Sequence, residues 1–197
     1  MLLNSKKIFY TVFICAFFII PALILPVSAD IFMFLDSEGV LHFTNVPTSS
    51  SYKLFIKEYP RKTTGYISTN RYDHLITEAS KRHDIPFSLL KAIIKAESNF
   101  NRKAVSKAGA LGLMQIMPYN LKSLHVDNPF NAWENVMGGT QYFKKMLLRF
   151  KGKLPWAIAA YNAGPARVDR YQGIPPIKET EDYVKRVMKY YYIFKNG

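Results

Sequence analysis

Apolar residues recur at helical spacing through most of the chain after residue 70. Pro86 stands where a proline opens a helix, and Phe87, Leu90 and Ile94 then repeat on one face. The same spacing predicts four further helices, over residues 71–82, 132–150, 156–162 and 181–194. Asn131 and Thr180 precede two of these segments and are residue types that cap helices. The pattern predicts a mainly α-helical domain.

The pattern differs between residues 30 and 57. Two β-prone runs, 31–35 and 40–44, flank Asp36-Ser37-Glu38-Gly39, which predicts a hairpin with a four-residue loop. Residues 52–56 could add a third strand. So small a hairpin is marginally stable alone and should pack on another element. Its aromatic residues form either its core and docking surface or a glycan-binding face: Phe32, Phe34, Phe43 and Phe55.

The first 29 residues have the pattern of a secretory signal. Lys6 and Lys7 precede an apolar run over residues 8–25, and the small residues Val27-Ser28-Ala29 predict cleavage after Ala29. The run is also near the lower limit for a membrane span, so an uncleaved anchor is the alternative. The single cysteine of the chain lies in this run, at position 15, so neither disulfide nor thiol chemistry is expected in the mature part.

The chain is strongly basic, with a formal net charge of +13. Removal of the signal takes away Lys6 and Lys7 and no acid, which leaves +11. An exported protein of this charge should meet an anionic polymer, so peptidoglycan and anionic envelope surfaces are the expected partners and nucleic acid is not. Because the lysines are scattered, a merely soluble surface is the plainer interpretation.

No metal site or cofactor is expected. The four histidines are widely separated, and none has a second ligand at metal-binding spacing. By its place in the pattern, His83 is expected to be exposed.

Glu97 is the first candidate for chemistry. It follows Ile93 and Ile94 on the apolar side of the helix that starts after Pro86. Burial raises the pKa of a carboxyl group, and a general acid that works near neutral pH needs such a pKa. The alternative is a solvated or lysine-paired acid at the helix rim. Gln115 lies further on among apolar residues, and a carboxyl beside an amide suits a ligand rich in hydroxyl and N-acetyl groups.

Three motifs carry a family resemblance. Glu97-Ser98, Gly112-Leu113-Met114-Gln115 and Ala160-Tyr161-Asn162-Ala163-Gly164-Pro165 resemble, in order and separation, the signatures of the soluble-type lytic transglycosylase (SLT) domain. The resemblance covers about residues 69–195 and implies a lysozyme-like fold. Residues 36–47 resemble a small module of unknown function that precedes envelope enzymes of proteobacteria. The expected division is a signal peptide (1–29), a β module (30–57), a linker (58–69) and an SLT domain (70–197).

The resemblance also implies a reaction and a site. Glu97 would cleave the bond between N-acetylmuramic acid and N-acetylglucosamine without water and leave a 1,6-anhydro end. The resemblance implies further roles for residues at matching positions. Ser106 and Gln115 would hold the muramoyl N-acetyl group, and Tyr161 would steady that group or the developing charge. Ser98 would support Glu97, and three residues would line the cleft: Met114, Asn162 and Glu179.

Two other functions stay open. A hydrolytic muramidase usually needs a second acid, about 5–5.5 Å or 6.5–9.5 Å from the first, and none is placed by a motif. The acids left as possible partners are Asp127, Glu134, Asp169 and Glu179. The third hypothesis is a non-catalytic glycan-binding or secretion-assembly protein. The presence of Glu97 argues against it.

Overall fold

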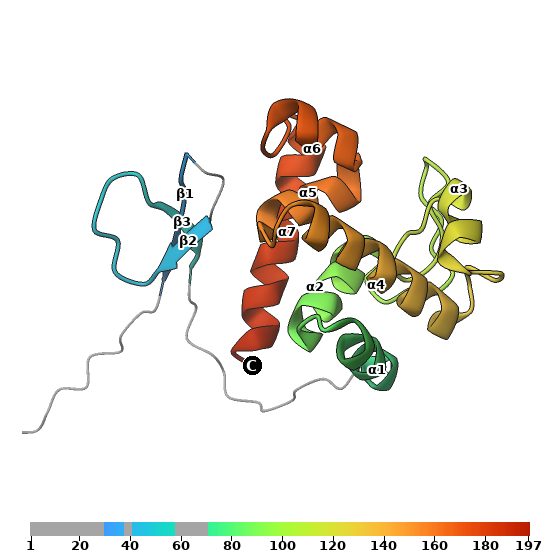
Figure 1. Cartoon of the computed structure of the whole chain (residues 1–197). Coiled ribbons are helices and arrows are strands. Elements are labelled where there is room, and N and C mark those ends of the chain that lie inside the picture. The colour runs from blue at the N-terminus through green and yellow to red at the C-terminus, as the bar shows by residue number, and fades with distance from the viewer. Residues whose placement is uncertain (1–29, 38–40, 58–70) are drawn as a thin grey trace, which may run out of the picture.

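The computed structural model describes residues 30–37, 41–57 and 71–197. A helical domain forms the larger part, and a small sheet lies beside it (Figure 1). The helices are α1 (Asp73–His83), α2 (Phe87–Ser98), α3 (Pro118–Leu121), η1 (a 3₁₀ turn, Lys122–Leu124), α4 (Ala132–Arg149), α5 (Leu154–Ala163), α6 (Pro165–Tyr171) and α7 (Lys178–Lys195). The strands are β1 (Ile31–Leu35), β2 (Leu41–Thr44) and β3 (Lys53–Ile56). The predicted mainly α-helical fold is confirmed.

The helix boundaries follow local chemistry in most places. The Asn131 side chain caps α4 by accepting hydrogen bonds from the amides of Trp133 and Glu134 at 3.0 and 3.3 Å, as predicted. The prediction for α7 was wrong at its start. This helix begins at Lys178, so Thr180 lies in its first turn, where it is buried and does not cap.

The core forms where α2, α4, α5 and α7 meet. Helix α7 packs most extensively against α2, and α5 packs against α4, α6 and α7. Residues 157–160 of α5 are all fully buried, as expected of a helix that is apolar on every side. Helix α7 thus lies along α2, whose last turn holds Glu97, and Tyr161 of α5 is near enough to feel the charge of Glu97.

A loop of short bridges fills the space between α2 and α4. Leu111 pairs with Val105 and with Ile116, and Gly112 has a positive φ of 80°. A Cβ atom on Gly112 would approach Asn135 Nδ2 and the Pro129 carbonyl oxygen to 2.3 Å, so only glycine fits. Gly139 of α4 is equally tight, because a Cβ there would lie 2.6 Å from that of Met114. The loop residue Met114 therefore packs directly on the backbone of α4.

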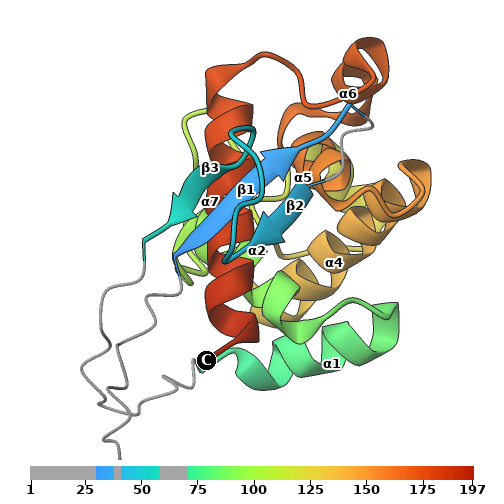
Figure 2. The same ribbon diagram turned by 90° about the vertical axis from the view of Figure 1, so that its left-hand side faces the viewer.

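The sheet has the order β2-β1-β3 with antiparallel pairing throughout. Met33 pairs with Phe43 on one side and with Lys53 on the other, so both the hairpin and its third strand are confirmed. Ile31 is buried and Phe55 packs against the helical core, which agrees with the expected docking. Both views show the sheet beside α7 (Figures 1 and 2). The proposed glycan-binding face of the sheet stays a prediction.

The predicted signal peptide and linker lie outside the described residues. Within the described ranges, no helix has the length and apolar character needed to span a bilayer.

Candidate active site

Glu97 lies in the last turn of α2, which ends where Asn99 adopts a left-handed conformation with φ of 50°. The residues one turn earlier, Ile93 and Ile94, are buried in the core, and Glu97 itself is half-buried. The hydroxyl of Tyr183, from α7, donates a hydrogen bond of 2.6 Å to Glu97 Oε1. Glu97 thus combines access to solvent with a fixed neighbour.

Burial raises the pKa of Glu97 from 4.5 to about 7. The hydrogen bond from Tyr183 and the positive charge of Arg186 oppose this shift, because both stabilise the carboxylate. The carboxyl is therefore divided between its acid and base forms near neutral pH. Since Oε1 accepts from Tyr183, the acidic proton belongs on Oε2, which can deliver it to a ligand.

Tyr161 is the second buried tyrosine of the site. Its hydroxyl donates to the carbonyl oxygen of Met114 at 2.8 Å, and its ring packs against Tyr142 and Phe143 of α4. Burial, followed by the charge of Glu97, raises the pKa of Tyr161 well above 10. Tyr161 consequently stays neutral and presents a fixed hydroxyl near Glu97.

Three polar side chains hold the loop that borders the site. Ser98 Oγ lies 2.8 Å from the Leu113 carbonyl oxygen and thereby ties the end of α2 to the loop. Both hydrogens of the Gln115 amide are used, by the carbonyl oxygens of Gly112 at 2.8 Å and Ala104 at 3.2 Å. Ser106 closes a turn, since its Oγ accepts from the amide of Ala110 at 2.9 Å.

Met114 differs from the expectation that it lines a cleft. Its side chain is fully buried and faces Gly139 and Thr140 of α4. The physical reason is that its amide donates to the buried Asn135 Oδ1 at 2.8 Å, which turns the side chain into the core. Met114 takes part in the site through its backbone carbonyl, the acceptor for Tyr161.

The third motif meets the start of α7 at the end of α5. Thr180 Oγ1 donates to Asn162 Oδ1 at 3.0 Å, and this bond holds the exposed Asn162 side chain against α7. Glu179 precedes Thr180 and is exposed in the first turn of α7.

The possible second acids have other roles. Glu134 Oε2 accepts from the amides of Asp127 and Asn128 at 2.8 and 2.7 Å, and Asp169 pairs with Arg149 at 2.6 Å. Asp127 and Glu179 are exposed. The side chains that shift the pKa of Glu97 are Tyr183 and Arg186, and neither is an acid. In the described part of the chain, no cluster of three His, Cys, Asp or Glu residues forms a metal site.

Sequence reasoning missed three residues that build this site: Tyr183, Asn135 and Arg186. Tyr183 lies on the apolar face of α7 and is buried, but helical spacing alone says nothing of where its hydroxyl group points. Asn135 is fully buried and forms hydrogen bonds with the backbone of Met114, Leu111 and Pro129. A polar residue within the apolar pattern of α4 was the signal in the sequence, because a buried amide needs partners.

The family model described as "Transglycosylase SLT domain" matches residues 74–184, which include Glu97, Tyr161 and Tyr183. The chain therefore belongs to the transglycosylase SLT domain family.

Individual relatives agree with this assignment. A soluble lytic murein transglycosylase of Salmonella typhimurium is 35% identical over 60% of this chain and 22% of the relative. A transglycosylase of Enterobacteria phage PRD1 is 32% identical over 58% of this chain and 40% of its own length. The chain spans about a quarter of the length of the soluble lytic murein transglycosylases that it matches.

Solved structures show the same fold. An inactive mutant of the lytic transglycosylase Slt from Pseudomonas aeruginosa has a TM-score of 0.61 and 27% identity, over 64% of this chain and 24% of that one. A complex of the 70-kDa soluble lytic transglycosylase with bulgecin A has a TM-score of 0.58 and 31% identity, over 64% and 25% of the two chains.

The raised pKa of Glu97 predicts how stability depends on pH. Between pH 4.5 and 7 the folded chain keeps a proton that the unfolded chain has lost, so the free energy of unfolding falls as pH rises through this window. Glu97→Gln removes the free-energy cost of ionising a buried carboxyl group. It should therefore raise the free energy of unfolding at pH 8 by up to about 3 kcal/mol, with little effect at pH 4. Urea unfolding at both pH values measures the difference. The exposed Glu179→Gln is the control, and an equal effect of Glu97→Gln at both pH values would contradict the shift.

Proposed function

We propose that this chain is a peptidoglycan lytic transglycosylase with Glu97 as its general acid and base. One observation carries the proposal. Glu97 is a half-buried carboxyl with a pKa of about 7, held by Tyr183, and no other acid is among the groups that shift this pKa. The names of the relatives, which are murein transglycosylases, support peptidoglycan as the substrate.

In the first step, Glu97 protonates the glycosidic oxygen between N-acetylmuramic acid and N-acetylglucosamine. The proton leaves from Oε2, while Tyr183 keeps its bond to Oε1 and stabilises the carboxylate that forms. The carbonyl oxygen of the muramoyl N-acetyl group attacks the anomeric carbon as the bond to the leaving oxygen breaks. The substrate supplies the nucleophile, so a second acid is not needed.

In the second step, the Glu97 carboxylate takes the proton of the C6 hydroxyl on the same sugar. The C6 oxygen bonds to the anomeric carbon, the N-acetyl oxygen leaves, and a 1,6-anhydro ring results. No water is consumed, and Glu97 regains its proton. A carboxyl with a pKa of about 7 is suited to both directions of transfer at neutral pH.

The other residues position the substrate and Glu97. Both hydrogens of the Gln115 amide are used in the loop, so its contribution to the N-acetyl group is the amide oxygen, which accepts from the sugar N–H. Tyr161 steadies the N-acetyl group near Glu97, and Asn162, Ser106 and Glu179 border the substrate. Ser98 acts indirectly by tying the end of α2 to the loop.

The products of peptidoglycan cleavage test the reaction. Since water is not added, the released fragments should end in 1,6-anhydromuramic acid and be about 18 mass units lighter than hydrolysis products. Mass spectrometry of a peptidoglycan digest measures this. Glu97→Gln is the control and should lower turnover by about 10²–10⁴-fold with the fold intact. Reducing muramic acid ends as the main product would show a hydrolytic muramidase instead.

The hydrogen bond from Tyr183 should set the pH dependence of the reaction. Because it lowers the pKa of Glu97, Tyr183→Phe should raise that pKa and move the pH profile of kcat/KM upward by about one unit. Tyr190→Phe, on the same helix, is the matched control. A Tyr183→Phe enzyme with lower activity but an unmoved profile would show that Tyr183 serves the fold alone.

The envelope is the proposed site of action, with residues 1–29 as the signal peptide, 30–57 as a separate β module and 58–69 as a linker. Relatives named membrane-bound lytic murein transglycosylases support an envelope location. The exported protein should then begin at Asp30, as N-terminal sequencing of the mature form would measure. A membrane-bound chain that retains Met1 would show that the apolar run is an anchor.

A further inference from the structure

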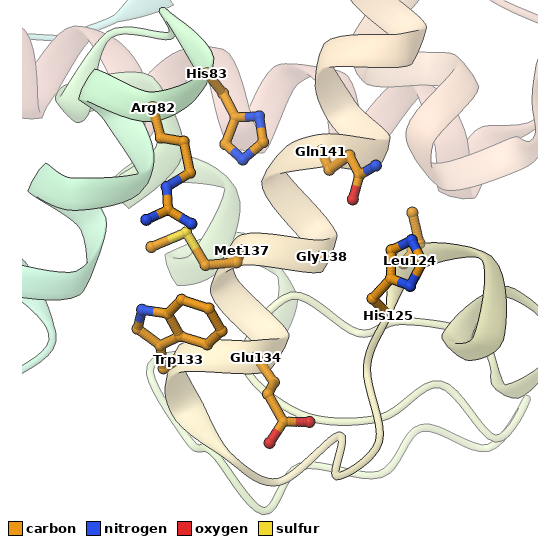
Figure 3. A pocket seen from close by; sticks show the side chains of 9 residues that line it. All are labelled: Arg82, His83, Leu124, His125, Trp133, Glu134, Met137, Gly138 and Gln141. Atoms are coloured by element: carbon orange, nitrogen blue, oxygen red, sulfur yellow. The ribbon is translucent and has the colours of Figure 1, made fainter.

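A pocket of about 320 Å³ lies between the end of α1, the first half of α4 and the turn that follows η1 (Figure 3). Its volume is at the lower end of the range for small-ligand sites. Two histidines from separate elements, His83 and His125, border it, although the sequence predicted an exposed His83. The other lining side chains that matter here are Arg82, Trp133, Glu134 and Gln141.

The pocket is distinct from the Glu97 site. Helix α4 turns Asn135 and Gly139 toward Met114 and the loop beside Glu97. Trp133, Met137 and Gln141 are spaced by four residues and therefore share the opposite face of α4. A ligand here would contact the domain on the other side of α4 from Glu97.

The lining does not suit a cation. Both backbone amides of the 127–128 turn donate to Glu134 Oε2, so this carboxylate already has partners. The Arg82 guanidinium lies 5.8 Å from the centre of the Trp133 ring and adds positive charge at the same wall. Arg82 is paired with Glu78 at 3.1 Å, and Glu134 is the single carboxylate among the residues that line the pocket, which is too few anionic ligands to hold a cation.

The polar groups suit a neutral ligand with several donors and acceptors. Burial, followed by the charges of Arg82 and Lys144, lowers the pKa of His83, so its imidazole is neutral at pH 7 and has one donor and one acceptor nitrogen. Gln141 adds an amide with both functions, and Figure 3 shows His83 and Gln141 at the same end of the pocket. The Arg82 guanidinium lies over one side of the Trp133 ring. Because Trp133 is still 43% exposed, the other side of the ring offers an apolar surface for the C–H face of a sugar ring.

An aromatic surface beside an amide and the neutral imidazole of His83 is the chemistry that recognises a sugar. We propose that this pocket binds one N-acetylated sugar unit, with its C–H face on Trp133 and its hydroxyl and amide groups at Gln141 and His83. The assignment of a wall glycan as the source of that unit rests on the proposed function, whereas the sugar chemistry rests on the lining alone.

Tryptophan fluorescence tests this directly, because the chain has only two tryptophans. Trp156→Phe leaves Trp133 as the single reporter, and Trp133→Phe leaves only Trp156, which packs beside Phe150 away from the pocket lining. Titration of the full chain with the tetramer of N-acetylglucosamine should change the Trp133 emission in a saturable way. The Trp156 emission should stay unchanged.

Two further variants locate the binding. Gln141→Ala should weaken the affinity seen by Trp133 at least threefold, whereas Lys145→Ala, an exposed change one turn along α4, should leave it unaltered. The proposal is overturned by the absence of a saturable change up to about 10 mM tetramer, where even a weak site would fill. It is equally overturned if Gln141→Ala has no effect, or if only an anionic probe, N-acetyl-D-alanyl-D-alanine, changes the Trp133 emission. Glu97-dependent cleavage is measured separately, so either proposal can fail without the other.

Discussion

The hydrogen bond between Tyr183 and Glu97 is the constraint on which the site depends. It joins α2 to α7, the two helices with the most extensive contact in the domain. Burial in this interface raises the pKa of Glu97, and the bond limits that rise to a value near neutrality. Without burial the carboxyl would be too weakly basic to hold a proton at pH 7, and without Tyr183 the folded state would favour the protonated form still more.

The loop beside Glu97 shows how motif residues act through the backbone. Three polar side chains form hydrogen bonds to backbone carbonyl or amide groups of residues 104–129: those of Ser98, Gln115 and Asn135. Buried backbone groups need partners, and the backbone bonds within this loop satisfy only some of them. These polar side chains provide hydrogen-bond partners that neighbouring strands would provide in a sheet. They thereby hold the Met114 carbonyl where it accepts from Tyr161. A motif that looks like a ligand-binding set is therefore partly a set of internal supports.

Helix α4 connects the two sites that we propose. One face, with Asn135 and Gly139, supports the loop near Glu97, and the other, with Trp133 and Gln141, lines the pocket next to α1. Gly139 permits this arrangement, because a side chain there would displace Met114. An 18-residue helix can carry both functions since its faces are separated by its own backbone.

Spacing and turn chemistry in the sequence determined most of the elements: the five longer helices, the Asn131 cap, the hairpin and the place of Glu97 near the end of an apolar helix. These features depend on neighbours within a few residues, and local patterns record such neighbours. The partner of Glu97, the inward turn of Met114, the position of Thr180 and the pocket beside His83 were decided only by the tertiary structure. Each depends on contacts between segments far apart in the chain. The apolar periodicity of one helix shows which of its faces is buried, but it does not show which other segment packs against that face.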